Sequence, residues 1–295
     1  MARSKVNFHI HTTYSDGQLD VPEIVAGLHR EGVEFFAITD HDSVEGNAAA
    51  CLEADRLGLS CYHGVELSCC FDGEAGFDSS YLCHIVGLGI DSNKMQIKLN
   101  RISDRAHTIL VRLVDALKRD GYDISVQSKL GSRTQVAQML IDKGYSDNIS
   151  ETFVKILNTD EYRGFANTKP YIKDGIDIIH SCGGIAIWAH PLDLARGGKQ
   201  RITDNQVVRL YDKLRREYDL DGIEVYYHKY DKDQIEFLDR LCRNDSIFCI
   251  KSIATDFHAH KPVSSRYNRS SLVFDIDGIA ADESIVDELR RRRLG

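Results

Sequence analysis

Histidines and carboxylates recur at or near the ends of short apolar segments along this chain. His9 and His11 stand two positions apart, so on a strand both imidazoles point to the same face. Imidazole nitrogens and carboxylate oxygens together are a donor set that suits manganese, iron or zinc. A single residue of this kind is ordinary, but nearly every apolar segment carries one. The histidines and carboxylates at or near these ends include His9, His11, Asp16, Asp40, His41, Glu66, His84, His190, Glu224, Asp256 and His258.

Seven apolar segments must position these residues, and their continuous apolar character is typical of strands buried on both faces. Helical patterns separate several of them, beginning for instance at Asp20-Val21-Pro22-Glu23, where Asp20 and Glu23 predict a capping box. This alternation predicts an α/β fold, and in a parallel barrel the strand ends meet at the face where active sites form. The predicted strands are Val6–His11, Phe35–His41, Tyr62–Leu67, Leu82–Leu88, Ile185–His190, Ile223–Tyr226 and Ile250–His258.

The alternation stops between about residues 91 and 174, where helical periodicity dominates. One helical face carries Ile102, Ala106, Ile109, Leu110, Leu113 and Leu117. This pattern predicts a small helical insertion domain after the fourth strand. We therefore expect barrel residues 1–92, an insertion at 93–173 that covers the substrate, and barrel residues 174–295.

Composition excludes several classes of protein. The 295 residues include 37 Lys and Arg against 45 Asp and Glu, and the net charge of −8 argues against binding to duplex DNA. No stretch approaches 18 uncharged apolar residues, so no membrane span is expected. The N-terminal residues lack the apolar region of a secretory signal, and the eight cysteines show no C-x2-C spacing. We expect a cytoplasmic protein with reduced thiols.

The series His9-x-His11, Asp16, Thr39-Asp40-His41, Glu66, His84, His190 and Asp256-x-His258 resembles the PHP (polymerase and histidinol phosphatase) family. The similarity extends to the small stand-alone branch that includes nucleoside 3',5'-bisphosphate phosphatases. It implies a distorted (β/α)7 barrel that holds two to three divalent ions, with manganese as the first expectation and iron or zinc as alternatives.

The resemblance also implies how the metals are shared. One would take His9, His11, Glu66 and Asp256. A second would share Glu66 and take His84 and His190, and a third would take Asp16, His41 and His258. A hydroxide held between the metals would attack the phosphorus. The resemblance does not identify the group that protonates the departing alcohol.

Other residues are expected around the ligands. Asp40 would orient a ligand histidine or act as a structural cap, and Glu224 would support a ligand or be a buried, paired carboxylate. Candidate substrate contacts follow from comparison with the family's motifs. In Gly131-Ser132-Arg133-Thr134-Gln135, Arg133 fits a phosphate-binding arginine, and Gln135 replaces the family's histidine. The remaining candidates are Lys169, His228 and Tyr230.

The expected activity is metal-dependent hydrolysis of a phosphoester in a small phosphorylated metabolite. A nucleoside 3',5'-bisphosphate or the end of a short oligonucleotide is the first substrate expected. The alternatives are a cyclic phosphodiesterase acting on a sugar cyclic phosphate, a histidinol-phosphate phosphatase, and a metal-binding accessory or regulatory domain without turnover. The complete ligand set favours an active enzyme.

Overall fold

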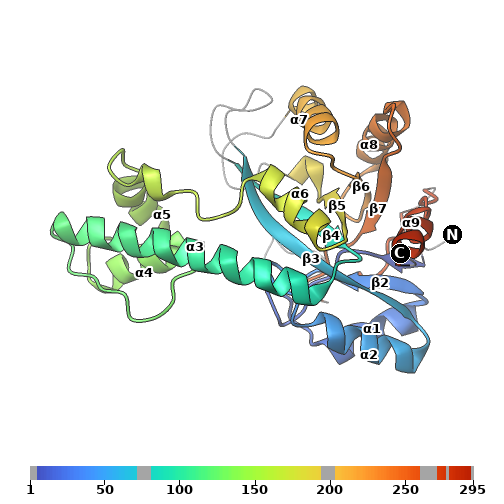
Figure 1. The fold of residues 1–295 in the computed structure, drawn as a ribbon, viewed down its shortest axis with the longest axis horizontal. Coiled ribbons are helices and arrows are strands. Elements are labelled where there is room, and N and C mark those ends of the chain that lie inside the picture. The colour runs from blue at the N-terminus through green and yellow to red at the C-terminus, as the bar shows by residue number, and fades with distance from the viewer. Residues whose placement is uncertain (1–4, 72–80, 194–202, 260–270, 277–278, 294–295) are drawn as a thin grey trace. The chain divides into compact units, whose positions relative to one another are not determined.

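The computed structural model describes residues 5–71, 81–193, 203–259, 271–276 and 279–293 (Figure 1). The chain divides into two compact units, one of Met1–Gln96 and Tyr171–Gly295 and the other of Ile97–Pro170. Helix α3 (Ser92–Arg119) begins in the first unit and continues in the second.

A seven-stranded sheet forms the centre of the first unit, with its strands in the order of the chain. The pairs β1–β2, β2–β3, β5–β6 and β6–β7 are parallel, whereas β4 is antiparallel to both of its neighbours. The strands are β1 (Val6–Asn7), β2 (Phe35–Ile38), β3 (Ser60–Phe71), β4 (Tyr81–Leu88), β5 (Ile185–Trp188), β6 (Gly222–Tyr227) and β7 (Ile250–Ala254).

The first and last strands approach each other and nearly close the sheet into a barrel. The Phe8 amide donates to the Ile253 carbonyl at 3.0 Å, and Ile10 forms a parallel bridge with Phe257. The predicted distorted barrel is therefore confirmed. The distortion includes the reversed direction of β4, which a regular β/α alternation would not contain.

Helices cover the outside of the barrel (Figure 1). Asp20 caps α1 in the predicted capping box with Glu23. Helices α1 and α2 pack against each other, and α2 packs on β3. Among the described residues, no helix combines the length and apolar character needed to cross a membrane. The elements outside the sheet are α1 (Val21–Glu31), α2 (Asn47–Leu57), α6 (Ile172–Ser181), the 3-10 helix η3 (Pro191–Asp193), α7 (Asp204–Glu217), α8 (Lys232–Asn244) and α9 (Ile285–Arg293).

The second unit has an apolar core of its own. Leu110, Leu113 and Leu117 on α3 pack with Val136 and Leu140 on α4, and all five side chains are buried. This face of α3 is the one that the apolar periodicity indicates. The elements after α3 are α4 (Arg133–Asp142), α5 (Ile149–Thr152), the π-helix η1 (Phe153–Leu157) and the 3-10 helix η2 (Arg163–Phe165).

Candidate metal centre

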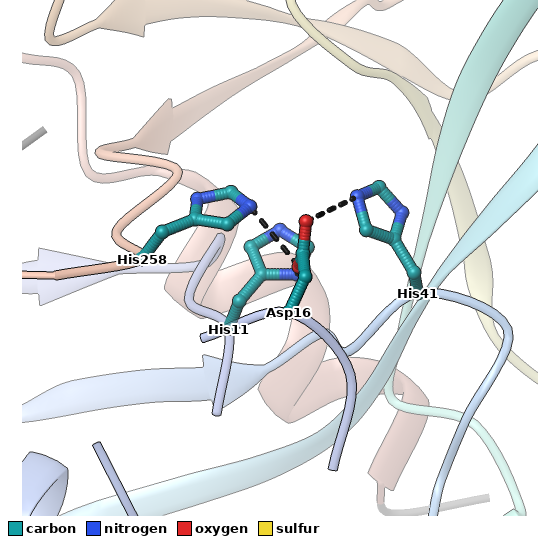
Figure 2. Close-up of side chains that lie close together, drawn as sticks. All are labelled: His11, Asp16, His41 and His258. Atoms are coloured by element: carbon teal, nitrogen blue, oxygen red, sulfur yellow. Dashed lines mark ion pairs between the residues drawn. The ribbon is translucent and has the colours of Figure 1, made fainter. Parts of the chain in front are cut away.

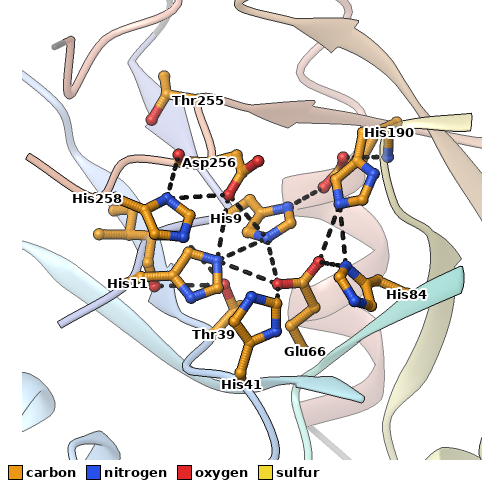
Figure 3. A network of polar contacts seen from close by, with 12 residues as sticks. His9, His11, Thr39, His41, Glu66, His84, His190, Thr255, Asp256 and His258 are labelled. Carbon is orange, nitrogen blue, oxygen red and sulfur yellow. Dashed lines mark hydrogen bonds and ion pairs between the residues drawn. The ribbon is translucent and has the colours of Figure 1, made fainter. Parts of the chain in front are cut away.

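Glu66, on β3, lies at the centre of the histidine cluster (Figure 3). Its Oε2 is 3.1 Å from Nε2 of His9, Nε2 of His11 and Nδ1 of His41. The other oxygen, Oε1, faces two further histidines, His84 and His190. The Glu66 side chain is almost completely buried, so the cluster surrounds it on both sides.

His84 and His190 face Glu66 Oε1 at 3.0 Å and 3.1 Å, through Nδ1 and Nε2 respectively. His84 lies in the first half of β4, whereas His190 follows the end of β5. Because β4 is antiparallel, its first half lies at the barrel end where β3 and β5 finish. The reversed strand thus brings His84 into the cluster.

Asp16 forms a second centre with three of the histidines (Figure 2). Its Oδ1 is 3.2 Å from His258 Nε2 and 3.6 Å from His11 Nδ1, and its Oδ2 is 3.9 Å from His41 Nε2. The turn that carries Asp16 is tight. A Cβ at Gly17 would lie 2.5 Å from the His11 carbonyl oxygen, so a glycine is required there.

One oxygen of the Asp256 carboxylate faces three histidines, including His11. Its Oδ1 is 3.3 Å from His11 Nε2 and from His258 Nδ1, and 3.7 Å from His9 Nε2. Asp256 and His190 both have positive φ values, 49° and 31°. Non-glycine residues in this left-handed region carry a conformational cost, and such strain concentrates at functional sites.

Three overlapping groups in the described residues bring ligand atoms within 4.8 Å of one another. His11 and His41 each belong to two groups, since both nitrogens of their rings face carboxylates. The groups are His9, His11 and Asp256; His41, Glu66 and His84; and His11, Asp16, His41 and His258.

Two buried polar atoms test whether this arrangement fits metal ions. Within the described residues, Glu66 Oε2 and His41 Nδ1 are buried and neither makes a hydrogen bond of acceptable geometry. Buried polar atoms without hydrogen bonds are costly, but a lone pair on each could be satisfied by a cation. The mixture of imidazole and carboxylate donors likewise suits divalent transition metals. The residues therefore fit a polynuclear metal site.

The charges in the cluster move several pKa values. Burial alone would raise the pKa of Glu66, but the surrounding histidines, His41 first, hold it well below its usual value. Burial lowers the pKa of His41 to about 3. Burial would also lower the pKa of His9, but Glu66 and Glu224 together raise it to about 10. A metal that binds His9 Nε2 must therefore displace a proton.

Glu224, on β6, supports two of the histidines at once. Its Oε1 is 2.6 Å from His9 Nδ1, and its Oε2 accepts a hydrogen bond of 2.7 Å from the His190 amide. The carboxylate is completely buried. Both contacts hold residues that are predicted metal ligands, His9 and His190.

Asp40 contacts the turn before Asp16, and within the described part of the chain its carboxylate makes no direct hydrogen bond to a predicted ligand histidine. It accepts hydrogen bonds from the Thr12 amide at 2.7 Å, from Thr12 Oγ1 at 2.7 Å and from Ser15 Oγ at 2.6 Å. Ser15 Oγ also lies 3.5 Å from Nδ1 of the predicted ligand His11. Asp40 holds the turn that presents Asp16.

Two of the predicted substrate contacts, Arg133 and Gln135, make hydrogen bonds to other residues of the second unit. Arg133 Nη2 donates to the Leu157 carbonyl and to Asn158 Oδ1, and the guanidinium lies over Phe153 at 5.1 Å. Gln135 Oε1 accepts from the amides of Gly131 and Ser132 in the capping box of α4, which is a structural role.

The remaining predicted substrate contacts lie in both units. Lys169 is half-buried in the second unit, and His228 is half-buried just after β6. Tyr230 is buried, and its hydroxyl accepts a hydrogen bond of 2.8 Å from the Leu192 amide. Tyr230 thereby anchors the segment that follows His190.

Tyr227 is a residue that the sequence pattern did not single out. Its hydroxyl donates to Asp256 Oδ2 at 2.8 Å, and its ring centroid lies 5.8 Å from that of His190. A β-bulge between Glu224 and Tyr226 shifts the register of β6. The extra residue turns Tyr227 to the same face as Glu224, and a strict two-residue alternation gives no sign of this.

The chain is similar in sequence to known proteins. The PHP domain model matches residues 7–128. A 5'-3' exoribonuclease of Haemophilus influenzae is 29% identical over 86% of this chain and 90% of its own length. A 3',5'-nucleoside bisphosphate phosphatase of Chromobacterium violaceum is 28% identical over 64% of this chain and 67% of its own.

A solved structure has the same fold. The structure of an amidohydrolase from Chromobacterium violaceum, with bound sulfate and no metal, superposes with a TM-score of 0.64. The match covers 98% of this chain and 97% of that chain at 24% sequence identity. At this identity the likeness supports the fold.

Proposed function

This chain belongs to the PHP family, and we propose that it hydrolyses a phosphomonoester of a small nucleotide with the help of divalent metal ions. It is a hydrolase acting on phosphoester bonds. The substrates that we propose are a nucleoside 3',5'-bisphosphate and the end of a short oligonucleotide. Relatives of this chain are named for a nucleoside bisphosphate and for RNA.

One observation carries this proposal, namely that five histidines face the two oxygens of the buried Glu66. Distances of 3.0 to 3.1 Å join these oxygens to the histidine nitrogens. We propose that Glu66 bridges two metals, because a carboxylate offers two oxygens to different partners. The proposed content is two to three ions, with manganese first and iron or zinc as alternatives. The ligands proposed are His9, His11, Asp16, His41, Glu66, His84, His190, Asp256 and His258.

Bound divalent ions would supply a nucleophilic water at neutral pH and would neutralise the charge of the phosphoryl oxygens. The chain's own residues prepare the site for this chemistry. Glu224 accepts from His9 Nδ1, which directs Nε2 of His9 toward the centre. The Asp256 carbonyl likewise lies 2.8 Å from His258 Nδ1, which leaves His258 Nε2 facing Asp16.

We also propose a cytoplasmic location. All eight cysteines lie in the described part of the chain, and each is a thiol rather than half of a disulfide. Reduced thiols are the usual state of cysteines in a reducing compartment.

The decisive experiment measures the products formed by the manganese-loaded protein. Adenosine 3',5'-bisphosphate would be compared with a short 5'-phosphorylated RNA and a sugar cyclic phosphate. Release of inorganic phosphate from one of the first two, with a kcat/KM at or above about 10⁴ M⁻¹s⁻¹, would support the proposal. Preference for the cyclic phosphate would overturn the monoester assignment, and no hydrolysis of any of them would overturn the nucleotide assignment.

Matched variants separate the metal centre from general damage. His41→Ala removes a ring that faces both Glu66 and Asp16, and we expect turnover to fall more than about a hundredfold. His29→Ala replaces an exposed histidine on α1 and should retain full turnover. Full activity in a folded His41→Ala variant would contradict the assignment of His41.

A further inference from the structure

Two buried cysteines outside the metal centre lie in direct contact. Cys242 is in the last turn of α8, and Cys249 immediately precedes β7. Their sulfur atoms are 2.7 Å apart, and the residues are only 6% and 5% exposed. A disulfide has an S–S length of about 2.05 Å, so little movement separates this contact from a covalent bond.

The segment between the two cysteines is held independently of the sulfur contact. Arg215, on α7, pairs with Asp245 through Nε at 2.7 Å. The same guanidinium donates through Nη2 to the carbonyls of Ile247 and Phe248, at 3.0 Å and 2.8 Å. The Asp245 amide also donates to the Cys242 carbonyl at 3.3 Å. These bonds hold the backbone between the two cysteines in place.

The two thiols differ in character. The hydrogen bond from Cys242 and the nearby charge of Arg215 lower the pKa of Cys249, although burial opposes this. The same contact and burial raise the pKa of Cys242. A thiolate is the reactive form of cysteine, so Cys249 is the better nucleophile of the pair.

The segment that connects the two cysteines has exposed residues. Ile247 and Phe248, next to Cys249, are exposed to 53% and 67%. Their exposure places this part of the connecting segment at the surface, directly before Cys249 in the sequence. Sulfenic acids condense readily with a neighbouring thiol, and here that neighbour is already in contact.

We propose that Cys242 and Cys249 are a modification site that forms a reversible disulfide on exposure to a peroxide. The Cys249 thiolate attacks one peroxide oxygen, the O–O bond breaks, and the departing hydroxide takes up a proton to give water. The Cys242 thiol then gives up its proton and its sulfur attacks the sulfenic sulfur, which expels the hydroxyl group as a second water. Two thiols are oxidised and one hydrogen peroxide is reduced to two water molecules.

This site is independent of the metal centre. Cys249 precedes the first residue of β7, whereas Asp256 and His258 follow the last residue of that strand. The test of the proposed disulfide therefore requires neither bound metal nor enzymatic turnover. Failure of the proposed hydrolase activity would leave the disulfide proposal unaffected, and the reverse also holds.

Peptide mapping after oxidation tests the proposal. The full-length protein would be treated with hydrogen peroxide, alkylated with N-ethylmaleimide and digested with trypsin. Cleavage after Arg240, Arg243 and Lys251 places the two cysteines in separate peptides, 241–243 and 244–251. We expect these peptides linked, with a mass loss of about 2 Da that dithiothreitol reverses.

Single variants add a second readout. After peroxide treatment, Cys242→Ser should give a dimedone adduct on residue 249, because the sulfenic acid then lacks its partner. Cys249→Ser should give no adduct on residue 242. Cys51→Ser changes a half-buried cysteine on α2 and should retain the link between the peptides.

Two outcomes would overturn the proposal. One is alkylation of both Cys242 and Cys249 at peroxide concentrations that already oxidise other cysteines. The other is a link that joins either residue to a different cysteine. The wild-type map alone decides the matter if a serine variant fails to fold.

Discussion

The Tyr227 hydroxyl donates a hydrogen bond of 2.8 Å to Oδ2 of Asp256, and both residues are buried. The other carboxylate oxygen, Oδ1, faces His9, His11 and His258 (Figure 3). Tyr227 therefore determines which oxygen of Asp256 points into the histidine cluster. Partners of this kind orient a ligand without touching the metal.

Replacing Tyr227 with Phe should weaken metal binding about 10- to 100-fold, because Asp256 loses the hydroxyl that fixes its carboxylate. Competition with a fluorescent chelator measures the affinity without any need for turnover. Tyr226→Phe is the matched control, since it removes a phenolic hydroxyl from the neighbouring residue of β6. The ring of Tyr226 packs against Phe274. Equal affinities in the two variants would contradict a positioning role for Tyr227.

Glu224→Gln should also lower metal affinity, by about one to two orders of magnitude. The glutamine side chain can accept a hydrogen bond through its oxygen but not through its nitrogen. Glu224, in contrast, accepts through one oxygen from His9 and through the other from the His190 backbone amide. Isothermal titration with manganese provides the measurement.

The barrel offers a close control for that variant. Asp221 Oδ2 contacts His180 Nε2 at 2.8 Å and accepts from the Ala186 amide at 2.8 Å, away from the cluster. Asp221→Asn disturbs the same kinds of contact, but we expect unchanged metal affinity. A similar loss of affinity in both variants would indicate a general effect on the barrel.

Removal of metal should lower the thermal stability of the protein. A ligand that binds only the folded state at 100 times its Kd adds about 2.7 kcal/mol to the free energy of unfolding. We expect manganese to raise the Tm by several degrees, and a chelator to reverse the change. The manganese effect should be much smaller in Glu66→Gln, because this residue contacts five histidines. A Tm that does not respond to manganese would count against a metal centre.

Acid should remove the stability that Asp245 contributes. Although burial opposes the shift, the hydrogen bond from Arg215 lowers the pKa of Asp245 in the folded protein below its unfolded value of about 3.9. The stabilisation is therefore complete above the unfolded pKa and is lost as the pH falls through the folded pKa.

Urea unfolding of the wild type and Asp245→Asn at several pH values tests this expectation. The variant should be less stable by about 3 kcal/mol at pH 7, because both side chains of the Arg215–Asp245 pair are nearly buried. The difference should shrink below about pH 4. Asp287→Asn, in an exposed pair with Arg290, should change stability by less than about 1 kcal/mol. A pH-independent difference for Asp245→Asn would contradict the predicted titration.

The sequence by itself determined the types of the residues that converge and the fold that carries them. His9 and His11 follow the short strand β1, and Asp256 and His258 follow β7, so their places after apolar segments were enough to mark strand ends. Apolar segments alternating with helical patterns were enough to predict an α/β fold, and the resemblance to the PHP family specified the barrel. The Asp20 capping box is equally local, since its four residues are consecutive.

Only the tertiary structure decided the direction of β4, the bulge in β6 and the contact between Cys242 and Cys249. Strand direction and bulges depend on backbone pairing between segments that are distant in sequence, and local periodicity is the same for either direction. His84 therefore reaches Glu66 from the first half of its strand, and Tyr227 reaches Asp256 across the bulge. Gln135 shows the converse, because a capping box gives it a structural role that its place in a family motif does not reveal.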